Sequence, residues 1–178
     1  MEALIIIDMI RDFVTGKFGF EEAKKIVPRL QLVLSKAREK RLPIFYVCDS
    51  HKPGDPELSI WGEHAMEGTP GSEVIPELSP ASGEHVIKKR AYSAFYETEL
   101  EKLLKNSGIN HLILTGVVTD ICVKHTAADA FFRGFRITVL SDCTASPQRH
   151  SHTESLEYMK RIYGARILSS TELLREWE

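Results

Sequence analysis

The sequence predicts a three-layer α/β/α fold built on a mainly parallel sheet of six strands. Short apolar runs alternate along the chain with longer segments whose apolar residues have helical spacing. The runs are apolar at consecutive positions, which is typical of strands that helices cover on both faces of a sheet. At 178 residues, 43% of them hydrophobic, the chain is long enough to bury a sizeable core. We therefore expect one domain over residues 1–178.

The first part of the chain predicts two strands and a helix. Residues 3–7 form a continuous apolar run rich in Ile. Residues 28–41 carry apolar residues at helical spacing, and Pro28 suits the first helical position, where its missing N–H costs nothing. Residues 43–48 indicate a second buried strand. Residues 49–83 are rich in Gly and Pro and predict a long irregular segment, which in a compact domain is usually functional.

The alternation continues to the end of the chain. Gly108 and Gly134 each follow an expected helix, at the position where helices commonly stop. The remaining strands are expected at residues 85–88, 111–115, 136–140 and 166–168, and the remaining helices at residues 97–106, 120–133, 151–163 and from residue 171.

Polar residues follow most of the expected strands. In parallel α/β sheets, ligands bind at the carboxyl ends of the strands, so these residues are candidates for a functional site. The positions concerned are Asp8, Asp49, Lys89 and residues 117–122. Asp142 also follows a strand, but we expect it to cap or orient the edge of the sheet.

Cys122 is a candidate nucleophile. Residues 115–122 read Thr-Gly-Val-Val-Thr-Asp-Ile-Cys, between an apolar run and a helix-like stretch. This places the thiol near a helix N-terminus, where we expect its pKa to be lowered. The alternative is a small buried hydrophobe, which is the role of most free cysteines.

Asp8 and Lys89 are candidates to act with this thiol. A carboxylate at the end of a buried strand costs free energy unless it is paired or used. Asp8 could accept and return the thiol proton, and Lys89 could stabilise the thiolate. The alternatives are a structural salt bridge for Asp8 and a solvated surface charge for Lys89.

Three motifs extend this constellation over most of the chain. They are Ile-Ile-Asp-Met-Ile-Arg-Asp-Phe at 6–13, Val-Ile-Lys-Lys at 86–89 with Tyr-Ser-Ala-Phe at 92–95, and Gly-Val-Val-Thr-Asp-Ile-Cys-Val at 116–123. Together they resemble the isochorismatase-like cysteine hydrolase superfamily, which includes nicotinamidases and N-carbamoylsarcosine amidases. The resemblance implies the catalytic triad Asp8, Lys89 and Cys122.

Lys88 is the rival for the lysine of the triad. The family pattern leaves one residue after the Val-Ile pair and three before the Ser, which selects Lys89. Because side chains alternate along a strand, Lys88 and Lys89 point to opposite faces and only one can serve.

The resemblance also implies the chemistry of the site. It implies a cis peptide bond between Val117 and Val118, and an oxyanion hole formed by the backbone N–H groups of Val118 and Cys122. True isochorismatases resemble the chain elsewhere but lack the cysteine. Its presence favours cleavage of a small amide through a thioester, with release of ammonia.

A metal site is expected beside the triad. Asp49 and His51, with His64 further along the loop, have the ligand types of zinc or a similar divalent ion, although loop histidines are usually only solvated. In nicotinamidases the corresponding metal can hold the pyridine nitrogen of the substrate. Phe13 and Trp61 would then form aromatic walls of the pocket; their alternative role is core packing.

The sequence leaves the substrate open. Nicotinamidases usually have Asp-Trp-His-Pro where this chain has Asp-Ser-His-Lys-Pro at 49–53. This loop looks equally like that of proteins related to N-carbamoylsarcosine amidase. We therefore expect a nicotinamidase-like enzyme, with a carbamoyl amidase or a non-catalytic metal- or metabolite-binding relative as alternatives.

Net charge and cysteine content indicate which partners and which compartment to expect. A net charge of −2 gives no reason to expect nucleic acid or an anionic membrane as a partner. Three cysteines without regular spacing argue against a disulfide framework and for a reducing compartment. We expect a cytoplasmic protein that binds no organic cofactor, and the resemblance suggests a homo-oligomer.

Overall fold

The computed structural model describes residues 1–178 and contains one sheet of six strands, in the order β3-β2-β1-β4-β5-β6. Every neighbouring pair is parallel, so the predicted α/β class is confirmed and the sheet is parallel throughout. The strands are β1 (Glu2–Ile7), β2 (Ile44–Asp49), β3 (His85–Lys89), β4 (His111–Val117), β5 (Arg136–Ala145) and β6 (Arg166–Leu168).

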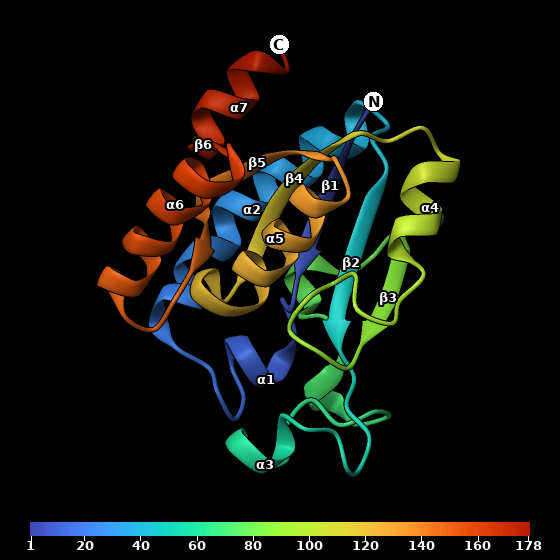
Figure 1. Cartoon of the computed structure of the whole chain (residues 1–178), viewed down its shortest axis with the longest axis vertical. Helices are drawn as coiled ribbons and strands as arrows, with labels where there is room; N and C mark the ends of the chain where they lie inside the picture. Colours follow the sequence, from blue (N-terminus) through green and yellow to red (C-terminus); the bar gives the residue numbers. More distant parts are fainter.

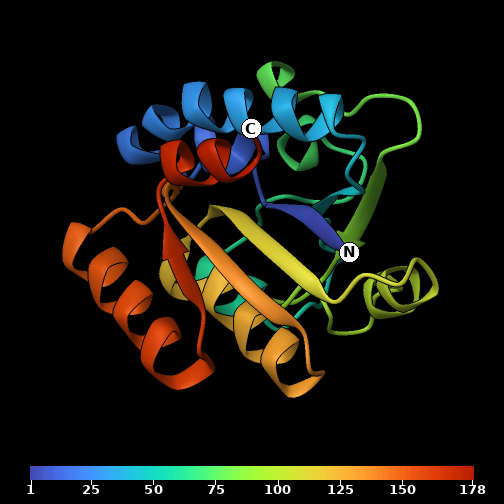
Figure 2. The same cartoon turned by 90° about the horizontal axis from the view of Figure 1, so that it is seen from above.

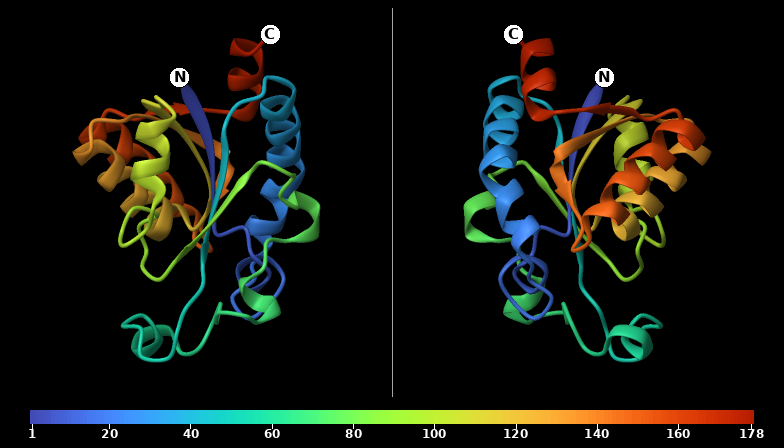
Figure 3. Two further views of the ribbon diagram at one scale, coloured as in Figure 1. Left: turned by 90° about the vertical axis from the view of Figure 1, so that its right-hand side faces the viewer. Right: turned by 90° about the vertical axis from the view of Figure 1, so that its left-hand side faces the viewer.

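Helices cover both faces of the sheet, as Figures 2 and 3 show. Two helices, α2 (Glu21–Glu39) and α7 (Ser170–Glu176), lie on one face. The other face carries α4 (Leu100–Asn106), α5 (Lys124–Phe132) and α6 (Arg149–Tyr163). None of the helices has the length and hydropathy needed to cross a membrane.

The continuous apolar run of β1 follows from its position between the two layers. Leu4 and Ile6 belong to the buried cluster under α2 and α7, whereas Ile5 and Ile7 belong to the cluster under α4, α5 and α6. Because successive side chains of a strand point to opposite faces, a strand buried on both faces needs apolar residues at every position.

The boundaries of helix α2 and strand β5 differ from the sequence prediction. Helix α2 begins at Glu21, so Pro28 lies inside it rather than at its first position. Ala23 and Ile26 are buried against the core, and this packing outweighs the backbone hydrogen bond that proline cannot donate. Strand β5 shifts register against β4 and continues to Ala145, so Asp142 lies within the strand and not at its end.

The expected helices at 97–106 and 120–133 also begin differently. Helix α4 starts only at Leu100, because Glu97 has a φ of 54° and cannot continue a right-handed helix. The segment after β4 opens with a π-helical turn, η3 (Thr119–Val123), before α5. Such turns often occur at functional sites.

The irregular segment after β2 folds over the carboxyl ends of the strands. It contains the short helix α3 (Leu58–Trp61), which Figure 1 shows beyond the end of the sheet together with α1 (Arg11–Val14). Two 3₁₀ turns, η1 (Pro70–Ser72) and η2 (Pro76–Leu78), lead back toward β3. The segment therefore forms part of the wall around the strand ends.

Gly116 is required where β4 passes β1. Its φ is +102°, and an added Cβ would overlap the carbonyl oxygen of Ile7. We expect Gly116→Ala to lower the free energy of unfolding by more than about 2 kcal/mol, since it adds a backbone clash to an unfavourable φ. Urea unfolding measures this.

Gly134→Ala is the matched control for this substitution. Gly134 also has a positive φ, +79°, but no atom lies within 4 Å of its added Cβ. We expect a loss of only about 1 kcal/mol, from backbone conformation alone. Equal losses at both glycines would contradict the role given to the close approach at Gly116.

Candidate active site

Four chemically active side chains meet at adjacent strand ends. Asp8 follows β1, Asp49 ends β2, Lys89 ends β3 and Cys122 lies in η3 directly after β4. Because these strands are neighbours in the order β3-β2-β1-β4, their carboxyl ends form one continuous edge. All four residues are buried, with at most 6% of their surface exposed.

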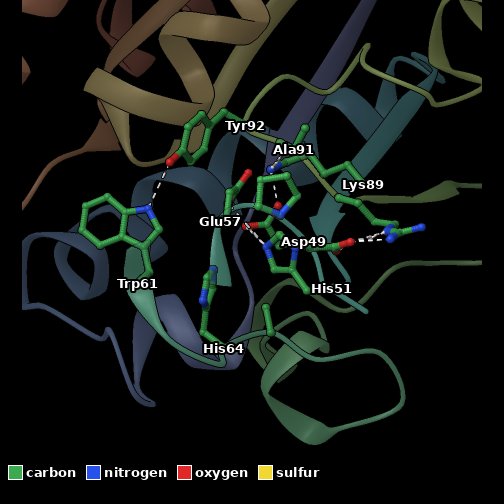
Figure 4. A network of polar contacts seen from close by, with 12 residues as sticks. Asp49, His51, Glu57, Trp61, His64, Lys89, Ala91 and Tyr92 are labelled. Carbon is green, nitrogen blue, oxygen red and sulfur yellow. Dashed lines mark hydrogen bonds and ion pairs between the residues drawn. The ribbon is translucent and has the colours of Figure 1, made fainter. Parts of the chain in front are cut away.

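The ammonium group of Lys89 lies at the centre of this group. Its Nζ is 2.9 Å from Asp8 Oδ2 and 3.6 Å from Cys122 Sγ, and it also pairs with Asp49 Oδ1. Nζ donates a further hydrogen bond of 2.9 Å to the carbonyl oxygen of Ala91 (Figure 4). One buried cation is thus shared by two carboxylates and a thiol.

Lys88 points away from this group. Its side chain is 65% exposed and pairs with Glu67 at 3.3 Å. The alternation of side chains along β3 therefore brings Lys89, and not Lys88, to Asp8 and Cys122.

Burial determines where the protons lie. It raises the pKa of Asp8 to about 7, and the nearby Asp49 adds to this, although Lys89 opposes both. Burial also raises the pKa of the Cys122 thiol well above its usual value, against the attraction of Lys89. The sequence-based expectation of a lowered thiol pKa was therefore wrong, because desolvation outweighs the neighbouring charge.

This proton distribution suits general-base chemistry. A thiol with a raised pKa is not a nucleophile until a neighbouring group removes its proton. Asp8 is in contact with Lys89 beside that thiol, and its Oδ1 accepts a 2.7 Å hydrogen bond from the N–H of Asp49. This hydrogen bond holds the carboxylate in position. A base whose pKa lies near neutrality can both accept and return a proton.

The peptide bond between Val117 and Val118 is cis in the structure. Val118 lies between β4 and η3, and its N–H donates none of the hydrogen bonds formed by the loop residues. Val118 and Cys122 both line a cavity at this edge of the sheet.

That cavity lies next to the buried group and has a volume of about 580 Å³. Phe13 and Trp61 line it, as the sequence predicted, and the indole N–H of Trp61 donates a 3.0 Å hydrogen bond to the Tyr92 hydroxyl (Figure 4). Phe18 and Phe20 add further aromatic surface. The cavity is thus large enough and apolar enough for a small aromatic molecule.

The charged residues that line the cavity are all acidic. They are Asp49, Glu57 and Asp120, and no Lys or Arg is among the lining residues. A bound molecule therefore contacts aromatic and acidic side chains and His64, but no Lys or Arg.

The predicted metal ligands Asp49, His51 and His64 come together beside Asp8, Lys89 and Cys122. Their ligand atoms lie within 4.8 Å of one another, and Glu57 belongs to the same cluster (Figure 4). The sequence analysis missed Glu57, because only its burial, with 7% exposed, distinguishes it from the many surface glutamates. The cluster offers two nitrogen and two carboxylate ligands, a set that suits zinc.

The hydrogen bonds within the cluster leave atoms free for a cation. His64 Nδ1 must donate to the carbonyl oxygen of Gly62, 2.8 Å away, which leaves its Nε2 lone pair available. His51 Nε2 and Glu57 Oε1 are buried and make no hydrogen bond, although Nε2 lies 3.4 Å from Glu57 Oε2 and 3.5 Å from Asp49 Oδ2. Unpaired buried polar atoms are rare and costly, so these residues fit a bound divalent cation.

The carboxylates around His51 also favour a bound cation in this cluster. Burial lowers the pKa of His51, but its contacts with Asp49, Glu57 and Asp55 outweigh burial and raise the pKa to about 10. Three carboxylates around one imidazole thus favour positive charge at this point.

Asp142, in contrast, is not part of the site. Its carboxylate accepts 2.7 Å hydrogen bonds from the backbone N–H and the hydroxyl of Ser170 at the start of α7. Its role is to hold that helix against β5.

The site thus combines an Asp, a Lys and a Cys at the ends of neighbouring strands of a parallel α/β sheet. The sequence model described as the isochorismatase domain matches residues 2–172. The chain therefore belongs to the isochorismatase family of hydrolases.

Three solved structures show how similar its relatives are. N-carbamoylsarcosine amidase from Thermoplasma acidophilum is 43% identical, with a TM-score of 0.91, over 95% of this chain and 96% of that one. Nicotinamidase PncA from Bacillus subtilis is 33% identical, with a TM-score of 0.90, over 94% and 99% of the two chains. A pyrazinamidase of Pyrococcus horikoshii in complex with zinc is 31% identical, with a TM-score of 0.87, over 94% and 98%.

Proposed function

We propose that the protein is an amidohydrolase that cleaves a small carboxamide through a thioester on Cys122. The observation that carries this proposal is the position of Lys89 Nζ, 2.9 Å from Asp8 and 3.6 Å from the Cys122 sulfur, next to a cavity of about 580 Å³. A base, a cation and a nucleophile that share one buried contact form a hydrolytic unit.

The first half-reaction forms the thioester. Asp8 takes the proton of the Cys122 thiol, and Lys89 stabilises the resulting thiolate. The sulfur attacks the amide carbon, and the backbone N–H groups of Val118 and Cys122 stabilise the oxyanion. The C–N bond then breaks, and Asp8 returns its proton to the nitrogen, which leaves as ammonia.

The second half-reaction restores the enzyme. Asp8, again a carboxylate, takes a proton from a water molecule that attacks the thioester carbon. The C–S bond breaks, the carboxylic acid is released, and Asp8 returns the proton to the sulfur. The sum of the two steps is one amide and one water converted to one acid and one ammonia.

The cavity favours an uncharged aromatic amide such as nicotinamide. Its aromatic lining matches a flat ring, and its charged lining residues are all acidic. A substrate carboxylate would be buried without a Lys or Arg to pair with, which costs free energy.

Asp49, His51, Glu57 and His64 would hold a divalent metal such as zinc beside this cavity. When bound, the metal would supply a Lewis-acidic contact that orients the substrate, for example through a ring nitrogen. The pyrazinamidase structure in complex with zinc supports this choice of ion.

A carbamoyl compound such as N-carbamoylsarcosine is the second candidate substrate. Its support is the 43% identity to the structure described as N-carbamoylsarcosine amidase, higher than the 33% to the nicotinamidase structure. Such a substrate uses the same triad, but no Lys or Arg lines the cavity, so a bound metal would be the main positive partner for its carboxylate.

Ammonia release from the two compounds tests the substrate. We expect kcat/KM for nicotinamide to exceed that for N-carbamoylsarcosine by at least about 100-fold in the chelator-treated protein, where no metal pairs with the carboxylate of the second compound. The assay is run on zinc-loaded and chelator-treated protein, with Cys122→Ala as the blank. Cysteine-dependent release from the carbamoyl compound alone would retain the triad and select the second candidate.

A further inference from the structure

A carboxylate outside the metal cluster lies directly behind one of its histidines. Asp55 is 4% exposed, and its Oδ2 is 3.0 Å from His51 Nδ1. The same oxygen accepts a 3.0 Å hydrogen bond from the N–H of Lys52. Asp55 is thus fixed to the loop that carries His51.

Arg90 holds the other side of this carboxylate. Its Nε donates to both oxygens of Asp55, at 3.0 and 3.1 Å, and its Nη2 also contacts Oδ1. A bidentate contact of this kind fixes a carboxylate more firmly than a single hydrogen bond does. Because Arg90 directly follows Lys89, the end of β3 fastens the metal-ligand loop to the triad.

We propose that Asp55 and Arg90 form a clamp that positions His51 as a ligand of the divalent cation. The inference rests on the metal site of the proposed function. In the clamp, Asp55 accepts a hydrogen bond from Nδ1 of His51, so that Nε2 presents its lone pair to the cluster. Asp55 and Arg90 are positioning residues and do not contact the cation.

The two histidines of the cluster are oriented by different means. The Nδ1–H of His64 donates to a backbone carbonyl, that of Gly62, which no substitution removes. The corresponding group of His51 is a side chain, and Nε2 of His51 lies without a hydrogen-bond partner on the cluster side. The orientation of His51 therefore depends on two replaceable residues.

Asp55 is not itself a ligand in this arrangement. It lies outside the group of Asp49, His51, Glu57 and His64, whose ligand atoms are mutually close. Both of its oxygens are occupied by Arg90, His51 and the backbone. Its carboxylate is therefore committed to holding the imidazole.

Zinc affinity tests the clamp directly. The full-length protein is freed of metal, and the Kd for Zn²⁺ is measured by competition with a chromophoric chelator. We expect Asp55→Asn to weaken binding by about 10- to 100-fold, as is typical when the hydrogen-bond partner of a metal-bound histidine is lost. Arg90→Gln should weaken it by about 3- to 10-fold, because the carboxylate stays but is no longer fixed.

The chain offers a matched control in the pair of Arg38 and Glu84. Arg38 also donates to both carboxylate oxygens, at 2.7 and 2.9 Å, and the Glu84 side chain is only 9% exposed. Glu84→Gln removes the same kind of charge pair far from the metal cluster. We expect its Kd for zinc to stay within about twofold of wild type.

A spectroscopic readout separates positioning from stability. In the Co²⁺-loaded protein, the ring N–H protons of the two coordinated histidines give shifted proton resonances. In Asp55→Asn, we expect the His51 N–H to exchange with water faster while the His64 N–H is unchanged. A substitution that acted only through overall stability would affect both protons alike.

The zinc affinities of these variants decide whether Asp55 and Arg90 position His51. Wild-type zinc affinity in both Asp55→Asn and Arg90→Gln would overturn it, as would equal weakening in Glu84→Gln. If Asp55→Asn does not fold, Arg90→Gln decides, because the Arg90 side chain is 51% exposed and tolerates replacement. If wild type does not bind zinc, the clamp is overturned, whereas ammonia release that depends on Cys122 would still support the hydrolase.

Discussion

Cys122→Ala is expected to reduce kcat for amide hydrolysis by at least about 10⁴-fold while the protein stays folded. Without the sulfur no thioester can form, and Asp8 and Lys89 have no nucleophile to activate. The loss of stability should stay within about 1 kcal/mol, because the side chain is small and its thiol, with a raised pKa, is uncharged.

Steady-state ammonia release and thermal unfolding measure these two effects on the same samples. Cys143→Ala is the control, since Cys143 is also buried but belongs to the core cluster under α2 and α7. We expect this variant to keep wild-type kcat. Activity retained in Cys122→Ala, or lost equally in both variants, would contradict the assignment of the nucleophile.

Lys89→Met is expected to damage both activity and stability. The Lys89 ammonium is fully buried and pairs with both Asp8 and Asp49, so its removal leaves Asp8 without a cation and leaves Asp49 with only His51. Breaking a buried ion pair in this way costs about 3–5 kcal/mol of unfolding free energy. The thiolate of Cys122 also loses its stabilising charge, and we expect kcat to fall by at least about 10³-fold.

Lys88→Met is the neighbouring control for this experiment. The exposed Lys88 side chain contacts only Glu67, so its loss should change the unfolding free energy by at most about 0.5 kcal/mol. Urea unfolding and ammonia release are measured on both variants. If Lys88→Met were the more damaging substitution, the choice between the two lysines would have to be reversed.

The alternation of apolar runs and helical segments predicted most of the fold. This pattern is strong because every strand of a parallel sheet covered by helices is buried on both faces. The pattern could not predict those ends of helices and strands that depend on packing in the folded protein. Helix α2 begins seven residues before Pro28, at Glu21, because residues that precede the proline are buried against the core. Strand β5 continues past its register shift to Ala145.

The candidate site was predictable where it depends on strand ends. Asp8, Asp49, Lys89 and Cys122 follow from the rule that parallel strands end at one edge. The loop residues Glu57 and Asp55 were not predicted, because their burial arises from how residues 49–83 fold back on the sheet. The raised pKa of Cys122 was missed for the same reason, since desolvation is a property of the folded site.

Interception of the thioester tests the central claim most directly. Hydroxylamine is added to wild-type protein that is hydrolysing nicotinamide, and the hydroxamate is quantified beside the acid. If the carbamoyl compound is the substrate, the intercepted product is instead an N-hydroxyurea, and it is quantified beside the amine that forms when the released carbamate loses CO₂. A thioester on Cys122 predicts that hydroxamate forms at the expense of acid as hydroxylamine rises, and that neither forms with Cys122→Ala. Release of ammonia and acid without any hydroxamate would contradict a covalent intermediate and, with it, the proposed role of Cys122.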